Sequence, residues 1–242
     1  MILAAGRGER MRPLTDDTPK AMLQVGGKPL IFRHLEKLAH AGFGLVVINH
    51  AYLGDQIESA VGDGGRWNLT IQFSPEAQAL ETAGGIRNAL PLLREQVFAV
   101  VNADVCSDYD YARLARAIRQ MQAATLAHLV LVDNPPHHPQ GDFSLKDSLV
   151  GTGPGALLTF SGIGAYRAAL FDPVARGARH PLAPLLREQM VLGRVTGEHF
   201  RGSLVVPELP QEPVRRDVGI FAATRMIHRG SVPCVVTSAI EH

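Results

Sequence analysis

Short apolar runs alternate with amphipathic stretches along most of the chain. Residues 1–5, 45–49 and 97–102 are apolar runs of the length expected for buried strands. Residues 29–42 instead carry apolar side chains at helical spacing, between a proline and a glycine that suit the two ends of a helix. The same reasoning predicts further helices over residues 53–61, 84–93, 109–122 and 182–192, and further strands over residues 69–73, 126–132 and 156–162.

Strands separated by helices predict right-handed βαβ crossovers. We therefore expect an α/β fold, with a Rossmann-like mixed, mainly parallel sheet flanked by helices. Ligands of such sheets bind beyond the carboxyl ends of the strands. Three unusual segments fall there, namely the loop after Ala5, residues 74–85 and residues 102–104. Their coincidence predicts one site.

The pattern changes near residue 203. Pro207, Pro210 and Pro213 follow in quick succession, and little periodicity is left. We predict a main domain over residues 1–202 and a divergent, poorly packed C-terminal tail over residues 203–242.

Composition narrows the class of protein. The 242 residues are 46% hydrophobic and 19% charged, with a net charge of +1, so a packed core is expected and a basic nucleic-acid surface is not. No apolar run approaches the roughly 20 residues that span a bilayer, and the N-terminus does not resemble a signal peptide. Two cysteines do not suggest a disulfide framework. We expect a cytoplasmic protein that binds neither nucleic acid nor membrane.

Residues 4–15 leave the first predicted strand through a glycine-rich turn. Gly6 and Gly8 can adopt positive φ angles, and successive amides in such a turn can bind an anion. Arg10 can donate forked hydrogen bonds to phosphate oxygens, and Lys20 supplies a compact charge. The spacing matches neither the dinucleotide-binding fingerprint nor the P-loop. The glycines alone would also fit a simple turn with solvated arginines.

The longer string is far more specific. It reads Leu3-Ala4-Ala5-Gly6-x-Gly8-x-Arg10-Met11-x-Pro13-Leu14-Thr15, followed by Pro19-Lys20. This string resembles the signature of the sugar-phosphate nucleotidyltransferase family, which has a GT-A-like nucleotidyltransferase fold. The resemblance implies that Arg10 and Lys20 are catalytic, because they stabilise charge on the phosphates and on the departing pyrophosphate. The triphosphate-binding residues that it implies are Ala5, Gly6, Gly8, Glu9, Arg10 and Lys20.

The resemblance continues to about residue 202. Segments 48–57, 74–76, 80–86 and 129–135 are similar to the N-acetylmuramate α-1-phosphate uridylyltransferases of cell-wall recycling. That branch implies UTP and N-acetylmuramic acid 1-phosphate as substrates; a guanylyl- or thymidylyltransferase for another hexose-1-phosphate is the alternative. The residues that it implies are Glu76, Glu81, Gly84 and Asn102 for the base and ribose, and Gly141 and Asp142 for the sugar. From the residues alone, the two glutamates could equally be solvated loop acids.

Asp104 follows an apolar strand, so its carboxylate should lie opposite the cationic phosphate ligands. Mg²⁺ prefers one or two carboxylates plus phosphate oxygens, and we therefore expect Asp104 to be a magnesium ligand. An aspartate after a strand is also a common turn residue.

The resemblance breaks after Gly202. Relatives continue with an aromatic residue, one further residue and Asp-Val-Gly-Thr, whose aspartate is a second magnesium ligand. Here Asp217-Val218-Gly219 comes later and is followed by Ile220. Three explanations stay open: an insertion delivers Asp217 to the metal, the tail is frame-shifted or divergent, or the site has lost a ligand. Asp217 also fits a surface acid beside two arginines.

Loss of a metal ligand would leave a catalytically impaired nucleotide-sugar-binding protein, which is the alternative function. The chain has no room for the oligomerising C-terminal domains of larger relatives, so we expect a monomer.

Overall fold

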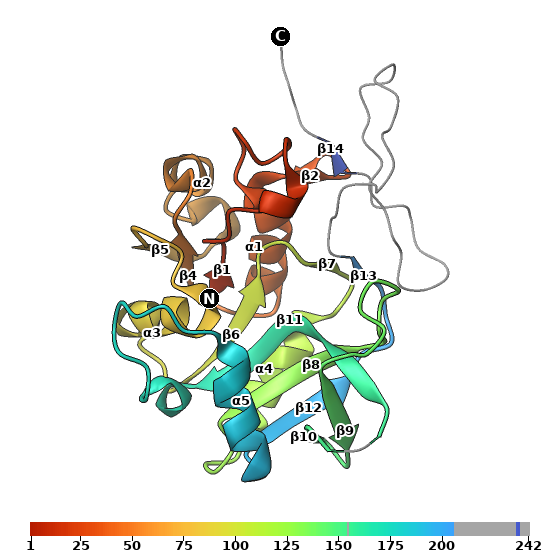
Figure 1. Ribbon diagram of the computed structural model, residues 1–242. Coiled ribbons are helices and arrows are strands. Elements are labelled where there is room, and N and C mark those ends of the chain that lie inside the picture. The colour runs from red at the N-terminus through yellow and green to blue at the C-terminus, as the bar shows by residue number, and fades with distance from the viewer. Residues whose placement is uncertain (154, 206–235, 238–242) are drawn as a thin grey trace.

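The computed structural model describes residues 1–153, 155–205 and 236–237 of the chain (Figure 1). The strands of its main sheet are β1 (Ile2–Leu3), β4 (Leu45–His50), β5 (Thr70–Pro75), β6 (Val97–Asn102), β8 (Ala127–Val132), β9 (Phe143–Lys146), β10 (Leu149–Gly151), β11 (Leu157–Arg167) and β12 (Val195–His199). They lie in the order β5-β4-β1-β6-β11-β8-β12-β10-β9.

The helices are α1 (Leu30–His40), α2 (Gly54–Val61), α3 (Glu81–Leu93), α4 (Tyr111–Gln120) and α5 (Leu182–Val191). Shorter strands are β2 (Gln24–Val25), β3 (Lys28–Pro29), β7 (Cys106–Ser107), β13 (Leu204–Val205) and β14 (Val236–Thr237). The 3₁₀ helices are η1 (Glu9–Met11), η2 (Lys20–Met22), η3 (Gly65–Trp67) and η4 (Ala168–Phe171).

The half of the sheet that carries the sequence motifs is parallel. β1 pairs in parallel with both β4 and β6, and β4 pairs in parallel with β5. The carboxyl ends of these strands therefore lie along one edge. The other half is reached through β11, which is antiparallel to β6 and β8. The predicted α/β fold with a mixed sheet is confirmed. The sheet is less parallel than predicted, because four pairings are parallel and five are antiparallel. The predicted site lies at the half formed by β5, β4, β1 and β6, where every pairing is parallel.

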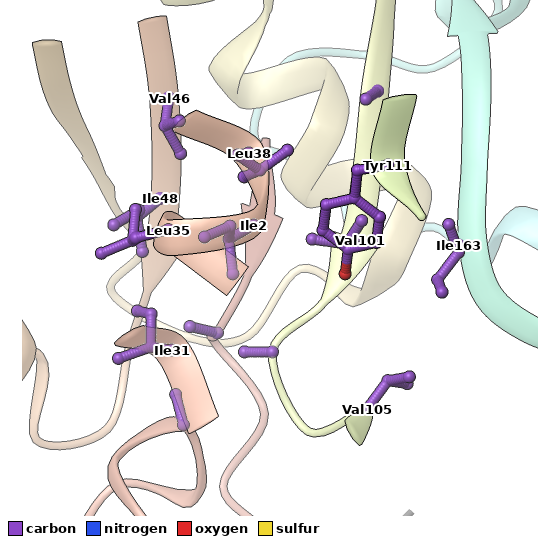
Figure 2. Packing of buried hydrophobic residues seen from close by; sticks show 14 of the residues in the cluster. Ile2, Ile31, Leu35, Leu38, Val46, Ile48, Val101, Val105, Tyr111 and Ile163 are labelled. Carbon is purple, nitrogen blue, oxygen red and sulfur yellow. The ribbon is translucent and has the colours of Figure 1, made fainter. Parts of the chain in front are cut away.

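Helices cover both faces of the sheet. Apolar side chains of α1, α2 and α4 pack on one face, and those of α3 and α5 pack on the other. Figure 2 shows the first face, where Leu35 and Leu38 of α1 and Tyr111 of α4 lie near Ile2 and Val101 of the central strands. Because both faces are covered, the central strands read as continuous apolar runs.

Every helix and strand predicted from the apolar pattern is present, with shifted ends. The hairpin of β9 and β10 was not predicted. Its turn contains Asp147 and Ser148, which both have positive φ angles (48° and 65°). Two-residue turns of this kind usually contain glycine or asparagine, and this one gives no such signal.

The start of the predicted tail is packed. β13 pairs antiparallel with β7, and Leu204 is only 4% exposed. β14 pairs antiparallel with β2. The remainder of residues 203–242 lies outside the described residues, so the division at residue 202 stays a prediction. In the part of the chain that the structure describes, no helix is long and apolar enough to cross a membrane.

Candidate active site

A cavity of about 310 Å³ lies at the carboxyl ends of β1, β4 and β6. Three stretches far apart in the sequence form most of it, namely the turn after β1, the start of α3 and the turn after β6. The residues that line it are Leu3, Ala4, Ala5, Gly6, Lys20, Ala21, Asn49, Ala79, Glu81, Thr82, Asn102, Ala103, Asp104 and Arg179. The cavity lies at the edge of the sheet where the sequence predicted one site.

Lys20 and Asp104, here called the lysine wall, contact each other in this cavity. Lys20 begins η2, and Asp104 lies in the turn after β6. The Nζ atom of Lys20 donates a hydrogen bond to Oδ2 of Asp104 over 2.6 Å. The side chains are 16% and 28% exposed, respectively, so water screens this pair less than a surface pair. An amine that can bind phosphate therefore lies directly beside a carboxylate that can bind a cation.

Gly8 shapes the turn that precedes the lysine wall. Its φ is +69°, and a Cβ atom there would lie 3.0 Å from Thr15 Cγ2 and 3.2 Å from Lys20 Cβ. The hydroxyl of Thr15 donates to the Gly8 carbonyl over 2.8 Å. A side chain at residue 8 would thus be strained by its backbone and would press on the stem of Lys20.

The far end of the same turn is anchored on α2 and the residues before it. The Tyr52 hydroxyl donates to the carbonyl of Asp16, and the Gln56 amide donates to the carbonyl of Asp17 over 3.0 Å. The guanidinium of Arg7 lies 5.0 Å from the centre of the Tyr52 ring, a cation–π contact. These contacts fix a long turn that has little regular structure of its own.

Asn49 connects the turn after β1 to a buried carboxylate. Its side-chain oxygen accepts a hydrogen bond from the Ala4 amide over 3.0 Å, and its side-chain amide donates to Glu76 over 2.7 Å. The second carboxylate oxygen of Glu76 accepts from the Leu80 amide over 2.9 Å. Glu76 is only 7% exposed and lies behind the cavity lining. The structure therefore corrects the interpretation of Glu76 as a solvated acid. Its buried carboxylate connects Asn49 near the end of β4 to Leu80 before α3.

Glu81 and Arg179, here called the arginine wall, form a second cation–carboxylate pair in the cavity lining. Arg179 Nη2 lies 2.9 Å from Glu81 Oε1, and the side chains are 74% and 39% exposed, respectively. Glu81 begins α3 with a φ of +60°, a left-handed conformation that is uncommon for a residue with a side chain.

The loop that carries Arg179 is docked on the start of α3. The His180 carbonyl accepts hydrogen bonds from the amides of Ala83 and Gly84, over 3.0 and 3.1 Å. The His180 amide donates to the Leu80 carbonyl over 2.9 Å. A Cβ atom on Gly84 would lie 2.3 Å from the Ala178 carbonyl oxygen. Gly84 therefore permits the close approach that brings Arg179 to the cavity.

A buried histidine lies behind the lysine wall. His34 of α1 is 3% exposed, and its Nδ1 lies 2.7 Å from the Tyr111 hydroxyl. Burial lowers the pKa of His34 to about 4, and the charge of Lys37 acts in the same direction. The charge of Asp104 and the backbone of Ala103 and Val105 act the other way. A neutral imidazole thus supports the turn that carries Asp104.

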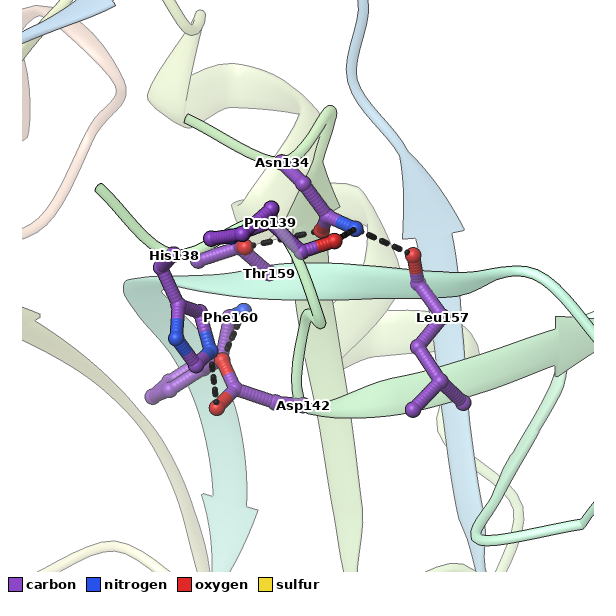
Figure 3. Close-up of polar contacts among 7 residues, drawn as sticks. All are labelled: Asn134, His138, Pro139, Asp142, Leu157, Thr159 and Phe160. Atoms are coloured by element: carbon purple, nitrogen blue, oxygen red, sulfur yellow. Dashed lines mark hydrogen bonds and ion pairs between the residues drawn. The ribbon is translucent and has the colours of Figure 1, made fainter. Parts of the chain in front are cut away.

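Asp142, one of the two predicted sugar residues, lies in a polar cluster outside the cavity lining, shown in Figure 3. Asp142 accepts a hydrogen bond from the Phe160 amide over 2.8 Å, and its other oxygen lies 3.1 Å from His138 Nε2. Gly141 has a φ of +68°, and a Cβ atom on it would lie 2.6 Å from the side-chain oxygen of Asn134. Both residues therefore hold the 134–142 connection against β11. Contact with a sugar stays a prediction for them.

The structure brings together six of the predicted residues as cavity lining: Ala5, Gly6, Lys20, Glu81, Asn102 and Asp104. Gly8, Glu76 and Gly84 are not among the described residues that line the cavity. Glu9 and Arg10 belong to η1, where both are exposed, and neither is among the described residues that line the cavity. Their predicted contact with a triphosphate stays a prediction. Asp217 lies outside the described residues.

Asn49, Thr82 and Arg179 line the cavity and were not predicted to bind a ligand. Asn49 is the penultimate residue of the apolar strand β4, so its position near a carboxyl strand end could have identified it. Thr82 lies in the predicted segment 74–85. Arg179 comes from an irregular loop before α5, and nothing in the sequence around it marks a site.

Asp104 fits a magnesium ion that binds together with a nucleotide. Among the residues that the structure describes, no group of three or more His, Cys, Asp or Glu side chains could hold a metal. Mg²⁺ commonly binds through one or two carboxylates and completes its coordination with phosphate oxygens and water. The described residues thus suit a metal that arrives with a polyphosphate, and not one held by side chains alone.

The fold and the cavity define the class of protein: an α/β protein in which a glycine-containing turn and a carboxylate line one cavity at the ends of parallel strands. The chain belongs to the nucleotidyl transferase family, which it matches over residues 1–143. The predicted family is therefore confirmed, and with it the general activity, transfer of a nucleotidyl group.

Known relatives agree with this assignment. The chain is 54% identical over 206 residues to the N-acetylmuramate alpha-1-phosphate uridylyltransferase of Neisseria meningitidis serogroup B, with 84% of this chain and 89% of that protein covered. It is 36% identical over 135 residues to the mannose-1-phosphate guanylyltransferase of Mycobacterium tuberculosis, with coverage of 56% and 38%. The crystal structure of HddC from Yersinia pseudotuberculosis shares the fold, with a TM-score of 0.68, 21% identity and coverage of 85% and 91%.

Proposed function

We propose that this enzyme transfers a uridylyl group from UTP to N-acetylmuramic acid 1-phosphate in cell-wall recycling, with Mg²⁺ as cofactor. The observation that carries the proposal is the lysine wall, in which Lys20 Nζ and Asp104 Oδ2 lie 2.6 Å apart in one cavity. The choice of UTP and of the sugar rests on the 54% identity to the Neisseria protein.

In this reaction an oxygen of the sugar-1-phosphate attacks the α-phosphorus of UTP. A bond forms between that oxygen and the α-phosphorus. The bond from the α-phosphorus to the oxygen that bridges to the β-phosphate breaks, and pyrophosphate leaves with the electron pair. The attacking phosphate is already largely anionic at pH 7, because its second pKa is about 6. No general base is required, so catalysis comes from alignment and from neutralised charge.

Different residues of the cavity would align the substrates and neutralise the charge of the triphosphate. Asp104 would hold Mg²⁺, which supplies positive charge to the triphosphate. Once Asp104 binds a cation, the amine of Lys20 can donate to a phosphate oxygen instead of to the carboxylate. Main-chain groups of Ala5 and Gly6 would approach the triphosphate closely, because both residues line the cavity and neither has a large side chain.

Pyrophosphate release measured across several substrates tests the proposal. We expect release that depends on Mg²⁺ with UTP and N-acetylmuramic acid 1-phosphate, and much slower release with GTP, dTTP, mannose 1-phosphate or glucose 1-phosphate. Faster release with another pair would overturn the assigned substrates. UTP binding without release from any pair would favour the alternative, a catalytically impaired nucleotide-sugar-binding protein.

A further inference from the structure

We infer that Arg179 is a base-recognition residue, whose guanidinium donates a hydrogen bond to a ring carbonyl oxygen of uracil while Glu81 orients it. The inference rests on the proposed function, because it takes UTP as the ligand of the cavity. The argument depends on three features: the position of Arg179, the charge of its surroundings and the hydrogen-bonding groups of the bases.

The position of Arg179 is fixed by its main chain. Its neighbour His180 makes three main-chain hydrogen bonds to Leu80, Ala83 and Gly84 at the start of α3. Its other neighbour, Ala178, packs against Gly84. A loop held in this way presents the arginine side chain to the cavity lining, where it contacts Glu81.

The charge of the arginine wall suits a neutral group. Glu81 lies 2.9 Å from the guanidinium, so the pair carries no net charge and its carboxylate would repel a phosphate. The lysine wall differs, because a cation bound to Asp104 would release Lys20 for phosphate binding. The phosphates therefore belong with Lys20 and the turn after β1, and the base belongs with Thr82 and Arg179.

The chemistry of the pyrimidines gives the pair a selective role. Arginine has only donors, and it cannot lose its proton in a protein. Uracil presents a carbonyl acceptor at the ring position where cytosine presents an amino donor. A guanidinium next to that position attracts uracil and is left without a partner beside cytosine. Sites built to hydrogen-bond one group reject the analogue that lacks it.

A purely structural role would not explain why Arg179 and Glu81 form an ion pair at this position. Exposed ion pairs contribute little to stability, and the Arg179 side chain is 74% exposed. Glu81 also has a φ of +60°, and strained conformations of this kind collect at ligand sites. Glu81 thus keeps a strained backbone, and its ion pair with Arg179 adds little to the stability of the fold. A ligand-binding role accounts for both observations.

Calorimetric titration with UTP, UMP and CTP in the presence of Mg²⁺ tests the inference. Arg179→Ala should weaken the binding of UTP and UMP alike by about tenfold, as for one hydrogen bond from a charged donor, and leave CTP binding unchanged. Arg179→Lys should restore part of the loss, because an ammonium can still donate one hydrogen bond to the carbonyl but is not held in a planar fork by Glu81. Arg176→Ala is the matched control, since Arg176 is an exposed arginine of the same loop that is not among the lining residues.

The other outcomes each contradict a different statement. A loss that is large for UTP and absent for UMP would show a phosphate contact and overturn base recognition. Equal affinities of the Arg179→Ala, Arg176→Ala and unmodified proteins for UTP would reduce the pair to a surface ion pair. If the unmodified protein itself bound no UTP, the proposed function would fail, and the inference with it.

Discussion

The two walls of the cavity each pair one cation with one carboxylate, but they are built differently. The lysine wall is half-enclosed at the ends of central strands, whereas the arginine wall is largely exposed on a loop docked against a helix. Charges in an enclosed place interact more strongly, because water screens them less. The lysine wall therefore suits the stabilisation of charge during the reaction, and the arginine wall suits the selection of a ligand.

Within one cavity, the proposed reaction thus depends on the lysine wall and the proposed base recognition on the arginine wall. Lys20 and Asp104 come from the sheet and the turns beside it, whose geometry is set by the packed core. Arg179 comes from a loop that can change without disturbing the sheet. An enzyme arranged in this way can keep its reaction while its choice of base changes.

The largest effect is expected at the lysine wall. Lys20→Ala should lower turnover by about 10²–10³-fold, because a preorganised charge on the phosphates is lost. Pyrophosphate release at saturating substrate measures this. Lys28→Ala is the control and should change turnover less than about twofold, because the Lys28 side chain forms an exposed ion pair with Glu36 and is not among the described residues that line the cavity. Full turnover by the Lys20 variant would remove the lysine wall from the mechanism.

Gly84→Ala tests how the arginine wall is held. The new Cβ atom would lie 2.3 Å from a main-chain oxygen of residue 178, so the docked loop must shift. We expect a loss of about 3 kcal/mol in the free energy of unfolding, measured with urea. The matched control is Gly44→Ala, where a Cβ atom meets nothing within 4 Å. Equal stability of the two variants would show that the loop is not held by this contact.

His34, which lies behind the lysine wall, makes the free energy of unfolding of the protein depend on pH. Its pKa is about 4 in the folded protein and about 6.5 when unfolded, so only the unfolded chain gains a proton at intermediate pH. Stability from this group is complete above pH 6.5 and is lost as the pH falls toward 4. Between pH 7 and pH 5 the free energy of unfolding should fall by about 2 kcal/mol on this account.

The matched variant for that measurement is His34→Gln, which has no titrating group at this position. Urea unfolding of both proteins at the two pH values isolates the contribution of the histidine. The pH-dependent loss should be smaller in the variant by the amount given above. An equal loss in both proteins would mean that folding does not lower the pKa of His34.

The smallest effect concerns the strain at Glu81. Glu81→Gly and Glu81→Ala both remove the ion pair to Arg179, but only glycine adopts a φ of +60° without strain. The glycine variant should therefore be more stable than the alanine variant by about 1 kcal/mol in urea unfolding. An alanine variant as stable as the glycine variant would mean that the start of α3 relaxes freely.

The lysine wall could be predicted from the sequence, and the arginine wall could not. Residues 3–15 and 19–20 form a string that resembles a family signature, and Asp104 follows an apolar strand, so the resemblance and the strand pattern together indicated this pair. Arg179 reaches Glu81 only through the docking of a distant loop, which no periodicity records. The burial of Glu76 could not be predicted either. In the sequence it has the pattern of a solvated loop acid, but in the structure it lies inside a hydrogen-bond network.

The fold followed the same rule. Strands covered on both faces were predicted because they are apolar throughout, as for residues 45–49 and 97–102. The β9–β10 hairpin was missed, because the turn-rich segment that contains Asp147 and Ser148 lacks the glycine that usually marks a two-residue hairpin turn. Asp217, the candidate for a second metal ligand, depends on a segment outside the described residues, and its role stays a prediction.

The central place of β1 has a consequence for how the protein is made. β1 is hydrogen-bonded on one side by β4 and on the other by β6, with Ile2 aligned to Val101. Ribosomes add residues in order, so one edge of β1 stays unpaired until synthesis has passed β6. Unpaired strand edges attract other chains. A polypeptide that stalls before β6 therefore cannot form the cavity, and it exposes a strand edge prone to aggregation.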